Sequence, residues 1–292
     1  MRTIVFYICL LTACFICGAK KIIIMPQLAE SDTIMYRTTA QTIMYHENDS
    51  LVSQTKLLPE IIVEGKNNKG FVIKTTNRLE DFNIECSDPS SDGQLPDKTE
   101  TLNDFVAAVV MRIQLDVDCR PDSILNMAEV RETLLNAYIR MFTKEQGMDI
   151  TRDAEWETET KPLMIGAIDM TYTPKHLIET QFGYIPYFNF IGIPLKSGKI
   201  PASMALPDEL QKMCPELKEL KMKVSQFETD MESGIEEKDG LYHIKLSGKK
   251  GTVEIDGELL YAAGILTNGF LSLRNESDTE KLISNYVIEI IR

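Results

Sequence analysis

Short runs of β-branched and aromatic residues, separated by turn residues, recur along the chain and predict β-strands. The clearest pair lies in PEIIVEGKNNKGFVIKTT, where residues 61–63 and 71–73 flank a polar segment rich in Gly, Asn and Lys. Asn and Gly accept the positive φ angles that a tight chain reversal requires. We therefore predict a β-hairpin whose turn lies within residues 65–70.

A repeated tetrapeptide stands just before this hairpin. Thr-Ile-Met-Tyr occurs at residues 33–36 and again at 42–45. A spacing of nine places the two copies on opposite sides of a continuous strand or helix. Two copies are also too few for a repeat architecture. We interpret the doublet as two adjacent short strands and not as a functional motif.

The middle of the chain predicts a strand, a helix and a second strand. Residues 111–118, MRIQLDVD, alternate apolar and polar, which indicates a strand with one solvated face. A helix is expected to begin at Pro121, capped by Asp122 or Ser123, and to end at Gly147. Residues 161–170, KPLMIGAIDM, have the apolar character of a buried strand.

A second amphipathic helix is predicted after Cys214 and Pro215. Its apolar residues recur at alternating intervals of three and four, at Leu217, Leu220, Val224, Phe227 and Met231. The stretch around Gly234 is expected to end it. The last fifty or so residues alternate short apolar runs with Gly, Asn and Asp turns, which predicts an antiparallel β-meander.

These elements predict an α+β fold with an N-terminal β-hairpin region, two main amphipathic helices and a C-terminal antiparallel meander. Residues 86–100, CSDPSSDGQLPDKTE, have almost nothing to bury. Part of this segment imitates a calcium-binding loop, but Thr99 stands where a bidentate Glu is required. We predict a small β-rich domain at 20–86, a linker at 87–101 and an α+β domain at 102–292.

The first nineteen residues predict export from the cytoplasm. Arg2 precedes a stretch at 4–19 without charged residues, which is typical of a secretory signal. Cleavage after Ala19 would release a chain that begins at Lys20. Alternatively, residues 11–14, Leu-Thr-Ala-Cys, resemble the bacterial lipobox, which makes Cys14 a lipidation candidate. An uncleaved signal that stays in the membrane is the remaining alternative.

Composition narrows the classes of partner and of chemistry. The chain carries a net charge of −13 with neutral histidines, and such a surface repels a phosphate backbone, so we expect no nucleic-acid partner. Outside the signal the cysteines are Cys86, Cys119 and Cys214, which allow one disulfide at most, and the sequence leaves the pairing open.

We find no sequence motif for catalysis, for a metal or for a cofactor. The three histidines are His46, His176 and His243, and none belongs to a zinc or hydrolase motif. The chain contains 44 acidic residues. A pair of carboxylates for sugar hydrolysis could come from these without leaving a local motif. We predict no metal and no cofactor, and the catalytic residues of any enzymatic activity stay unknown.

One segment concentrates aromatic residues. Residues 181–195, QFGYIPYFNFIGIPL, contain Phe182, Tyr184, Tyr187, Phe188 and Phe190. An exposed aromatic row can stack on sugar rings or anchor a protein partner. These five residues are therefore the candidates for ligand or partner binding, and the alternative is that they lie in the core.

A short resemblance points to the bacterial envelope. Residues 57–66, LLPEIIVEGK, resemble the segment near the start of outer-membrane TonB-dependent receptors. In that family the segment pairs as an added strand with an energy-transducing protein, which implies a partner of that kind here.

The sequence favours an exported bacterial cell-envelope protein, periplasmic, outer-membrane lipid-anchored or secreted, that acts as a binding or interaction module. Its partner would be an envelope protein or a carbohydrate, and a lipid anchor or an uncleaved signal would give the one contact with a membrane. The alternative is a secreted hydrolase, carbohydrate-active, with unidentified carboxylates. A third reading is a surface component that recruits another envelope protein through the aromatic segment.

Overall fold

The computed structural model describes residues 22–46, 49–86, 107, 109–147, 149–152, 154–178, 190–195, 231–238, 240–276 and 280–291. These residues form mostly antiparallel β-sheet with a few helices, so the α+β class is confirmed at this level. The first nineteen residues, including Cys14, and the whole of the predicted linker at 87–101 lie outside the described residues.

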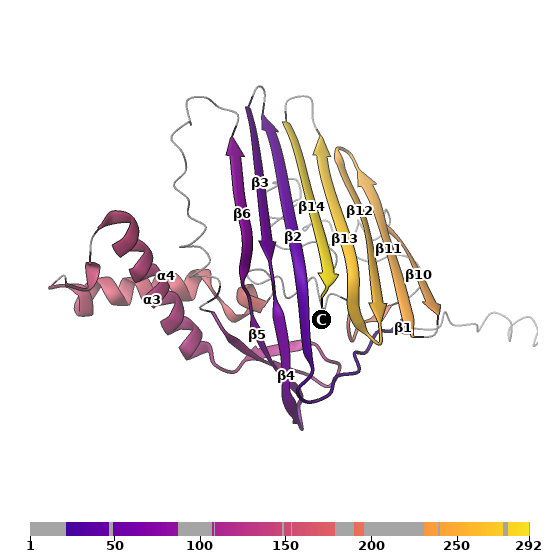
Figure 1. Ribbon diagram of the computed structural model, residues 1–292, viewed down its shortest axis with the longest axis horizontal. Helices are drawn as coiled ribbons and strands as arrows, with labels where there is room; N and C mark the ends of the chain where they lie inside the picture. The colour runs from indigo at the N-terminus through magenta and orange to yellow at the C-terminus, as the bar shows by residue number, and fades with distance from the viewer. Residues whose placement is uncertain are drawn as a thin grey trace, which may run out of the picture.

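A broad antiparallel sheet holds most of the described chain (Figure 1). Its N-terminal strands are β2 (Thr33–His46), β3 (Asp49–Leu57), β4 (Glu60–Asn67), β5 (Gly70–Thr76), β6 (Leu79–Cys86), β7 (Met111–Leu115) and β8 (Pro121–Ile124). Its C-terminal strands are β10 (Met231–Lys238), β11 (Leu241–Lys250), β12 (Val253–Ala262), β13 (Ile265–Glu276) and β14 (Glu280–Ile290). β1 (Ile22–Ile23) and β9 (Pro194–Leu195) pair separately.

Strand β2 is the branch point of the sheet. One edge of β2 pairs with β14 over residues 36–46. The other edge pairs with β3 over residues 38–46 and with β4 over residues 33–35. The sheet therefore divides into a β3–β6 arm and a β4–β5–β7–β8 arm. Because β2 pairs with β14, the segments before and after the predicted linker contribute strands to one sheet.

Several strand predictions can be compared with this topology. β4 and β5 pair antiparallel where the hairpin is predicted, with the turn at residues 68–69, and β11 to β14 form the predicted meander. The interpretation of the doublet is wrong, because both copies lie in the single long strand β2. Residues 57–66, which resemble the receptor segment, fall at the end of β3 and in β4, and β4 is already paired with β2 and β5.

Strand β7 ends earlier than its alternation predicts. Leu115 is its last residue, and the chain then turns, with the Asp116 carboxylate accepting hydrogen bonds from the backbone N–H groups of Asp118 and Arg120. The alternation places Gln114 on the solvated face, but the structure buries it. Its side-chain amide donates to the carbonyl oxygens of Phe71 (3.1 Å) and Leu115 (2.7 Å). These hydrogen bonds replace the ones that the amide would make to water.

The first predicted helix is present but begins later. Residues 121–124 form strand β8, and helix α3 runs over Met127–Gln146. It ends at Gly147, whose φ of 64° is left-handed, as predicted. Most of the second predicted helix lies outside the described residues. Met231, assigned to that helix, instead begins β10, and Gly234 lies inside β10.

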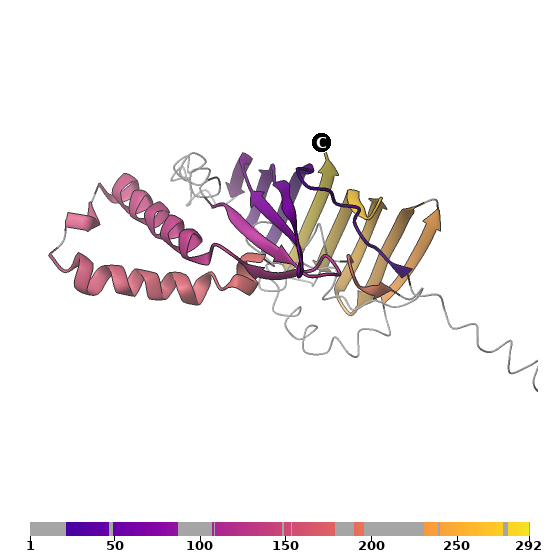
Figure 2. The same cartoon turned by 90° about the horizontal axis from the view of Figure 1, so that it is seen from below.

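A helix replaces the buried strand predicted at 161–170. Helix α4 spans Lys161–Thr171 and packs against α3, and both project from the side of the sheet (Figures 1 and 2). Leu163 and Met170 are 73% and 85% exposed, so an apolar sequence does not mean a buried element here. Short helical segments at Ile150–Arg152, Trp156–Thr160 and Pro174–His176 complete this region. None of the described helices combines the length and apolarity needed to cross a membrane.

The hydrophobic core follows one face of the sheet. Alternate residues of β11 to β13, such as Ile244, Ile255 and Leu273, are buried, and the residues between them face outward. Tyr36 on β2 and Leu134 on α3 belong to the same buried cluster. The period of two therefore leaves the opposite face of these strands open, and that face carries the site described next.

Candidate functional site

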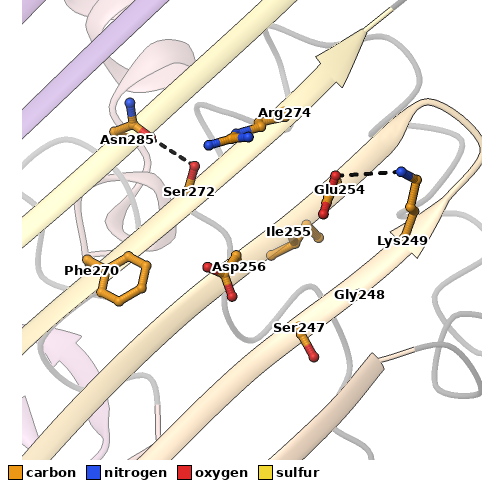
Figure 3. A pocket seen from close by; sticks show the side chains of 10 residues that line it. All are labelled: Ser247, Gly248, Lys249, Glu254, Ile255, Asp256, Phe270, Ser272, Arg274 and Asn285. Atoms are coloured by element: carbon orange, nitrogen blue, oxygen red, sulfur yellow. Dashed lines mark hydrogen bonds and ion pairs between the residues drawn. The ribbon is translucent and has the colours of Figure 1, made fainter.

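An open pocket of about 620 Å³ lies on the outward face of the C-terminal strands (Figure 3). Four adjacent strands supply its outward side chains. These are Ser247 and Lys249 from β11, Glu254 and Asp256 from β12, Phe270, Ser272 and Arg274 from β13, and Asn285 from β14.

The register of the sheet arranges polar side chains of this pocket in a row across the strands. Ser247 lies opposite Asp256, Asp256 opposite Ser272, and Ser272 opposite Asn285. Directly opposed residues of antiparallel strands project on the same face, roughly 5 Å apart. The Ser272 hydroxyl donates to Asn285 Oδ1 at 2.8 Å, as the dashed line in Figure 3 marks. The floor of the pocket therefore offers both hydrogen-bond donors and acceptors.

A charged row runs beside the polar one. Glu254 lies opposite Lys249 on one side and Arg274 on the other, and its Oε2 is 3.6 Å from Lys249 Nζ. This row therefore places two cations and one carboxylate side by side at the border of the pocket.

An aromatic ring borders the pocket on the other side. The Phe270 side chain is 38% exposed and lies opposite Val287, which is 40% exposed. Neighbouring Glu258 lies opposite Phe270 on the other strand and pairs with His243. An exposed ring beside hydrogen-bonding groups can stack on the apolar face of a sugar while those groups bind its hydroxyls.

Two carboxylates of the pocket share one strand face. Glu254 and Asp256 are two residues apart on β12, so their attachment points are separated by about 6.6 Å. Glycosidases also use a pair of carboxyl groups in their chemistry. Within the described part of the chain, no cluster of three or more His, Cys, Asp or Glu side chains could hold a metal ion.

Of the five aromatic residues predicted to bind a ligand or partner, Phe190 is the one that lies among the described residues. Phe190 is fully buried in the core, so it cannot belong to an exposed aromatic row, and for this residue the core alternative holds. Phe182, Tyr184, Tyr187 and Phe188 lie outside the described residues.

The cysteines and histidines show no reactive constellation among the described side chains. Cys119 is buried and not bridged, and burial, reinforced by Asp116, raises the pKa of its thiol and disfavours the nucleophilic thiolate. The side chain of Cys86 and all of Cys214 lie outside the described residues. His243 Nε2 contacts the carboxylate of Glu258, and the half-buried ring of His176 lies beside the ring of Tyr172.

A second pocket of about 470 Å³ lies between α3 and α4. Its cations already have partners, because Arg131 Nε bonds to Asp169 at 2.6 Å and Lys161 Nζ bonds to Glu157 at 3.0 Å. Trp156, also in its lining, is buried. The sheet-face pocket is therefore the stronger candidate, and sequence reasoning missed it because its residues meet only through strand register.

Comparisons with known proteins add little. No protein-family model matches the chain, and no curated protein matches it either. Among solved structures the chain is similar to lipovitellin, a structure concerned with lipid–protein interactions, with 8% sequence identity and a TM-score of 0.38. The match covers 91% of this chain and 26% of lipovitellin, so the chain spans about a quarter of that protein's length.

Proposed function

We propose that the chain is an exported bacterial cell-envelope protein, periplasmic or lipid-anchored, that acts as a binding module for carbohydrate. The binding surface is the outward face of β11 to β14, in place of the aromatic segment that the sequence favours. The observation that supports this assignment is the combination of a polar row with an exposed aromatic ring in one open pocket.

The chemistry of the pocket matches a hydroxyl-rich ligand. Ser247, Ser272 and Asn285 each carry donor and acceptor capacity, which suits hydroxyl groups that are themselves both donors and acceptors. Phe270 supplies an apolar surface for a ring face. The strongly negative chain disfavours polyanionic ligands, so an uncharged sugar fits the surface better than a nucleic acid.

Binding is tested by titrating the mature protein with soluble neutral oligosaccharides in a calorimeter. Phe270→Ala should weaken binding by about tenfold or more, because the stacking surface of the ring is lost. Leu163→Ala is the matched control, since it also removes an exposed apolar side chain but on α4, away from the pocket. Equal affinity of Phe270→Ala and wild type would contradict the proposal.

The export half of the proposal is supported by the uncharged stretch at 4–19 behind Arg2. The intact mass of the protein purified from bacterial membranes and periplasm tests it. An acylated chain beginning at Cys14 indicates a lipoprotein, and a chain beginning at Lys20 indicates cleavage by signal peptidase. A cytoplasmic protein that retains Met1 would contradict export.

A secreted hydrolase is the second candidate, favoured by the position of Glu254 and Asp256 on one strand face. One carboxyl group would protonate the glycosidic oxygen and the other would activate water. Release of reducing sugar from a bound oligosaccharide, abolished by Asp256→Asn, would establish this alternative.

A further inference from the structure

We infer that the polar row continues beyond the pocket and forms a linear track that binds an uncharged, unbranched polysaccharide laid across the strands. This inference rests on the proposed function and extends it to a ligand shape. Asn285, the last row residue of the pocket, lies opposite Gln41 on β2. Gln41 lies opposite Gln54 on β3, and Gln54 lies opposite Asn83 on β6.

The track therefore crosses seven neighbouring strands, with one hydrogen-bonding side chain on each. The strands lie side by side in the order β11, β12, β13, β14, β2, β3, β6 (Figure 1). Neighbouring strands are about 4.8 Å apart, so the hydrogen-bonding groups form a nearly regular ladder. A ladder of this kind suits a ligand that repeats the same hydroxyl groups along its length.

The track extends beyond the pocket through Gln41, Gln54 and Asn83, whose side chains are all primary amides. Each Asn or Gln amide can donate two hydrogen bonds and accept others. The Asn83 amide donates to Glu85 Oε1 at 2.8 Å, which leaves its oxygen as an acceptor. Over the described ranges, no side-chain hydrogen bond involves Gln41 or Gln54, and both are partly exposed. Their amides are available to a ligand.

Two ion pairs lie beside the extension of the track. Lys56 Nζ lies 3.0 Å from Asp81, and Arg37 Nε lies 3.1 Å from Glu80. Asp256 is the one charged side chain among the seven track residues, so the track as a whole selects a neutral chain. None of the seven track residues is a cation that would attract a polyanion.

Apolar side chains flank the amides along the strands. Two residues away from Asn285, Gln41 and Gln54 on the same face stand Ile283, Ile43 and Val52, which lie opposite one another in register. A sugar chain presents C–H faces as well as hydroxyl edges, and this aliphatic row offers contact for those faces. The groups lie on the face of the sheet and not at an edge, so the track does not offer the backbone pairing that an added protein strand requires.

The test titrates the mature chain with neutral linear oligosaccharides of increasing length, using gluco- and manno-oligomers from disaccharide upward. In the wild type, affinity should rise with length until the track is filled. The double variant Gln41→Ala/Gln54→Ala should bind the longest oligomer at least tenfold more weakly while its affinity for a disaccharide in the pocket stays unchanged. Gln27→Ala, which removes an exposed amide away from the track, is the matched control and should bind as the wild type does.

The variants distinguish failure of the track from failure of the pocket. If the double variant keeps the full length dependence while Phe270→Ala abolishes binding, the pocket stands and the track is wrong. If no neutral oligosaccharide binds, both proposals fail. If uronic-acid oligomers bind more tightly than neutral ones of equal length, the assignment of a neutral ligand is overturned. Thermal unfolding of each variant confirms that loss of binding is not loss of folding.

Discussion

The side-chain oxygens of Thr42 and Ser284 lie 2.7 Å apart on the buried face of the sheet, where β2 meets β14. Both side chains are buried, so the two hydroxyl groups satisfy each other in place of water. The two residues are 242 positions apart in the chain. Their contact therefore lies at the junction of the N-terminal strands and the C-terminal meander, where β2 and β14 also pair over residues 36–46 of β2.

Replacing Ser284 by Ala should lower the free energy of unfolding by about 1–3 kcal/mol, because the Thr42 hydroxyl is left buried without its partner. Adding Thr42→Val removes the orphaned hydroxyl and should recover part of the loss. Urea unfolding of both single variants and the double variant measures the coupling between the two residues. If the two single losses simply add, the hydrogen bond contributes nothing of its own.

Asn126 fixes the start of α3 through its side chain. Its Oδ1 accepts from the backbone N–H of Arg112 at 2.8 Å, and its Nδ2 donates to the carbonyl of Val110 (3.0 Å) and to Glu129 Oε2 (3.2 Å). Asn126→Asp removes both donated bonds and places a carboxylate against two acceptors. We expect a loss of about 2–4 kcal/mol in urea unfolding. The same change at exposed Asn136 should alter stability by less than about 0.5 kcal/mol, and similar losses at both sites would contradict this role.

Gly264 and Gly251 form a matched pair for testing close backbone packing. Both are left-handed, with φ of 76° and 59°, so an Ala at either position carries the same intrinsic strain of about 1–2 kcal/mol. A Cβ at Gly264 would lie 2.1 Å from the carbonyl oxygen of Met25, whereas a Cβ at Gly251 would meet nothing within 4 Å. Thermal unfolding should show a clearly larger loss for Gly264→Ala. Equal losses would mean that the N-terminal segment does not pack against this turn.

Local chemistry explains which elements the sequence could predict. The β4–β5 hairpin and the C-terminal meander follow from turn residues beside β-branched runs, and Gly147 ends α3 because its left-handed conformation suits glycine. These features depend on a few neighbouring residues and on no distant contact.

Helix α4 could not be predicted because its apolar residues occur on all sides. Leu163 and Met170 are exposed, while Ile168, on the opposite side, is buried. No polar face marks the period of 3.6, so the segment has the composition of a buried strand. The late start of α3 has a different cause. Asn126 bonds to the backbone of β7, a tertiary contact that local capping rules do not include.

The candidate site also depends on tertiary contacts, so the sequence alone could not predict it. The polar track exists because Asn285 meets Gln41 and Gln41 meets Gln54, and that register depends on strands far apart in the chain. The sequence instead concentrates aromatic residues at 181–195, and the binding row predicted there includes Phe190, which is buried. A cross-strand row leaves no local motif, because each strand contributes one residue to it.

Two buried phenols should make the fold sensitive to alkaline pH. Burial raises the pKa of Tyr261, and of Tyr36, above the ordinary value of 10.0, because a phenolate is poorly solvated in the core. In the unfolded chain both groups ionise from about pH 10 upward. Their contribution to stability is therefore complete below about pH 10 and is lost as the pH rises toward the folded-state values, by about 1.4 kcal/mol per pH unit for each phenol.

Tyr261→Phe removes one of these ionisations, so the free energy of unfolding should fall less steeply above about pH 10 than it does in the wild type. Urea unfolding at a series of pH values from about 8 to about 11 measures the two slopes, and the slope is independent of any change that the variant causes at neutral pH. Tyr45→Phe, at a side chain that is 44% exposed, is the control and should keep the wild-type slope. Parallel curves for Tyr261→Phe and wild type would show that Tyr261 has the same pKa in the folded and unfolded chains. That result would contradict the burial of its phenol in the core.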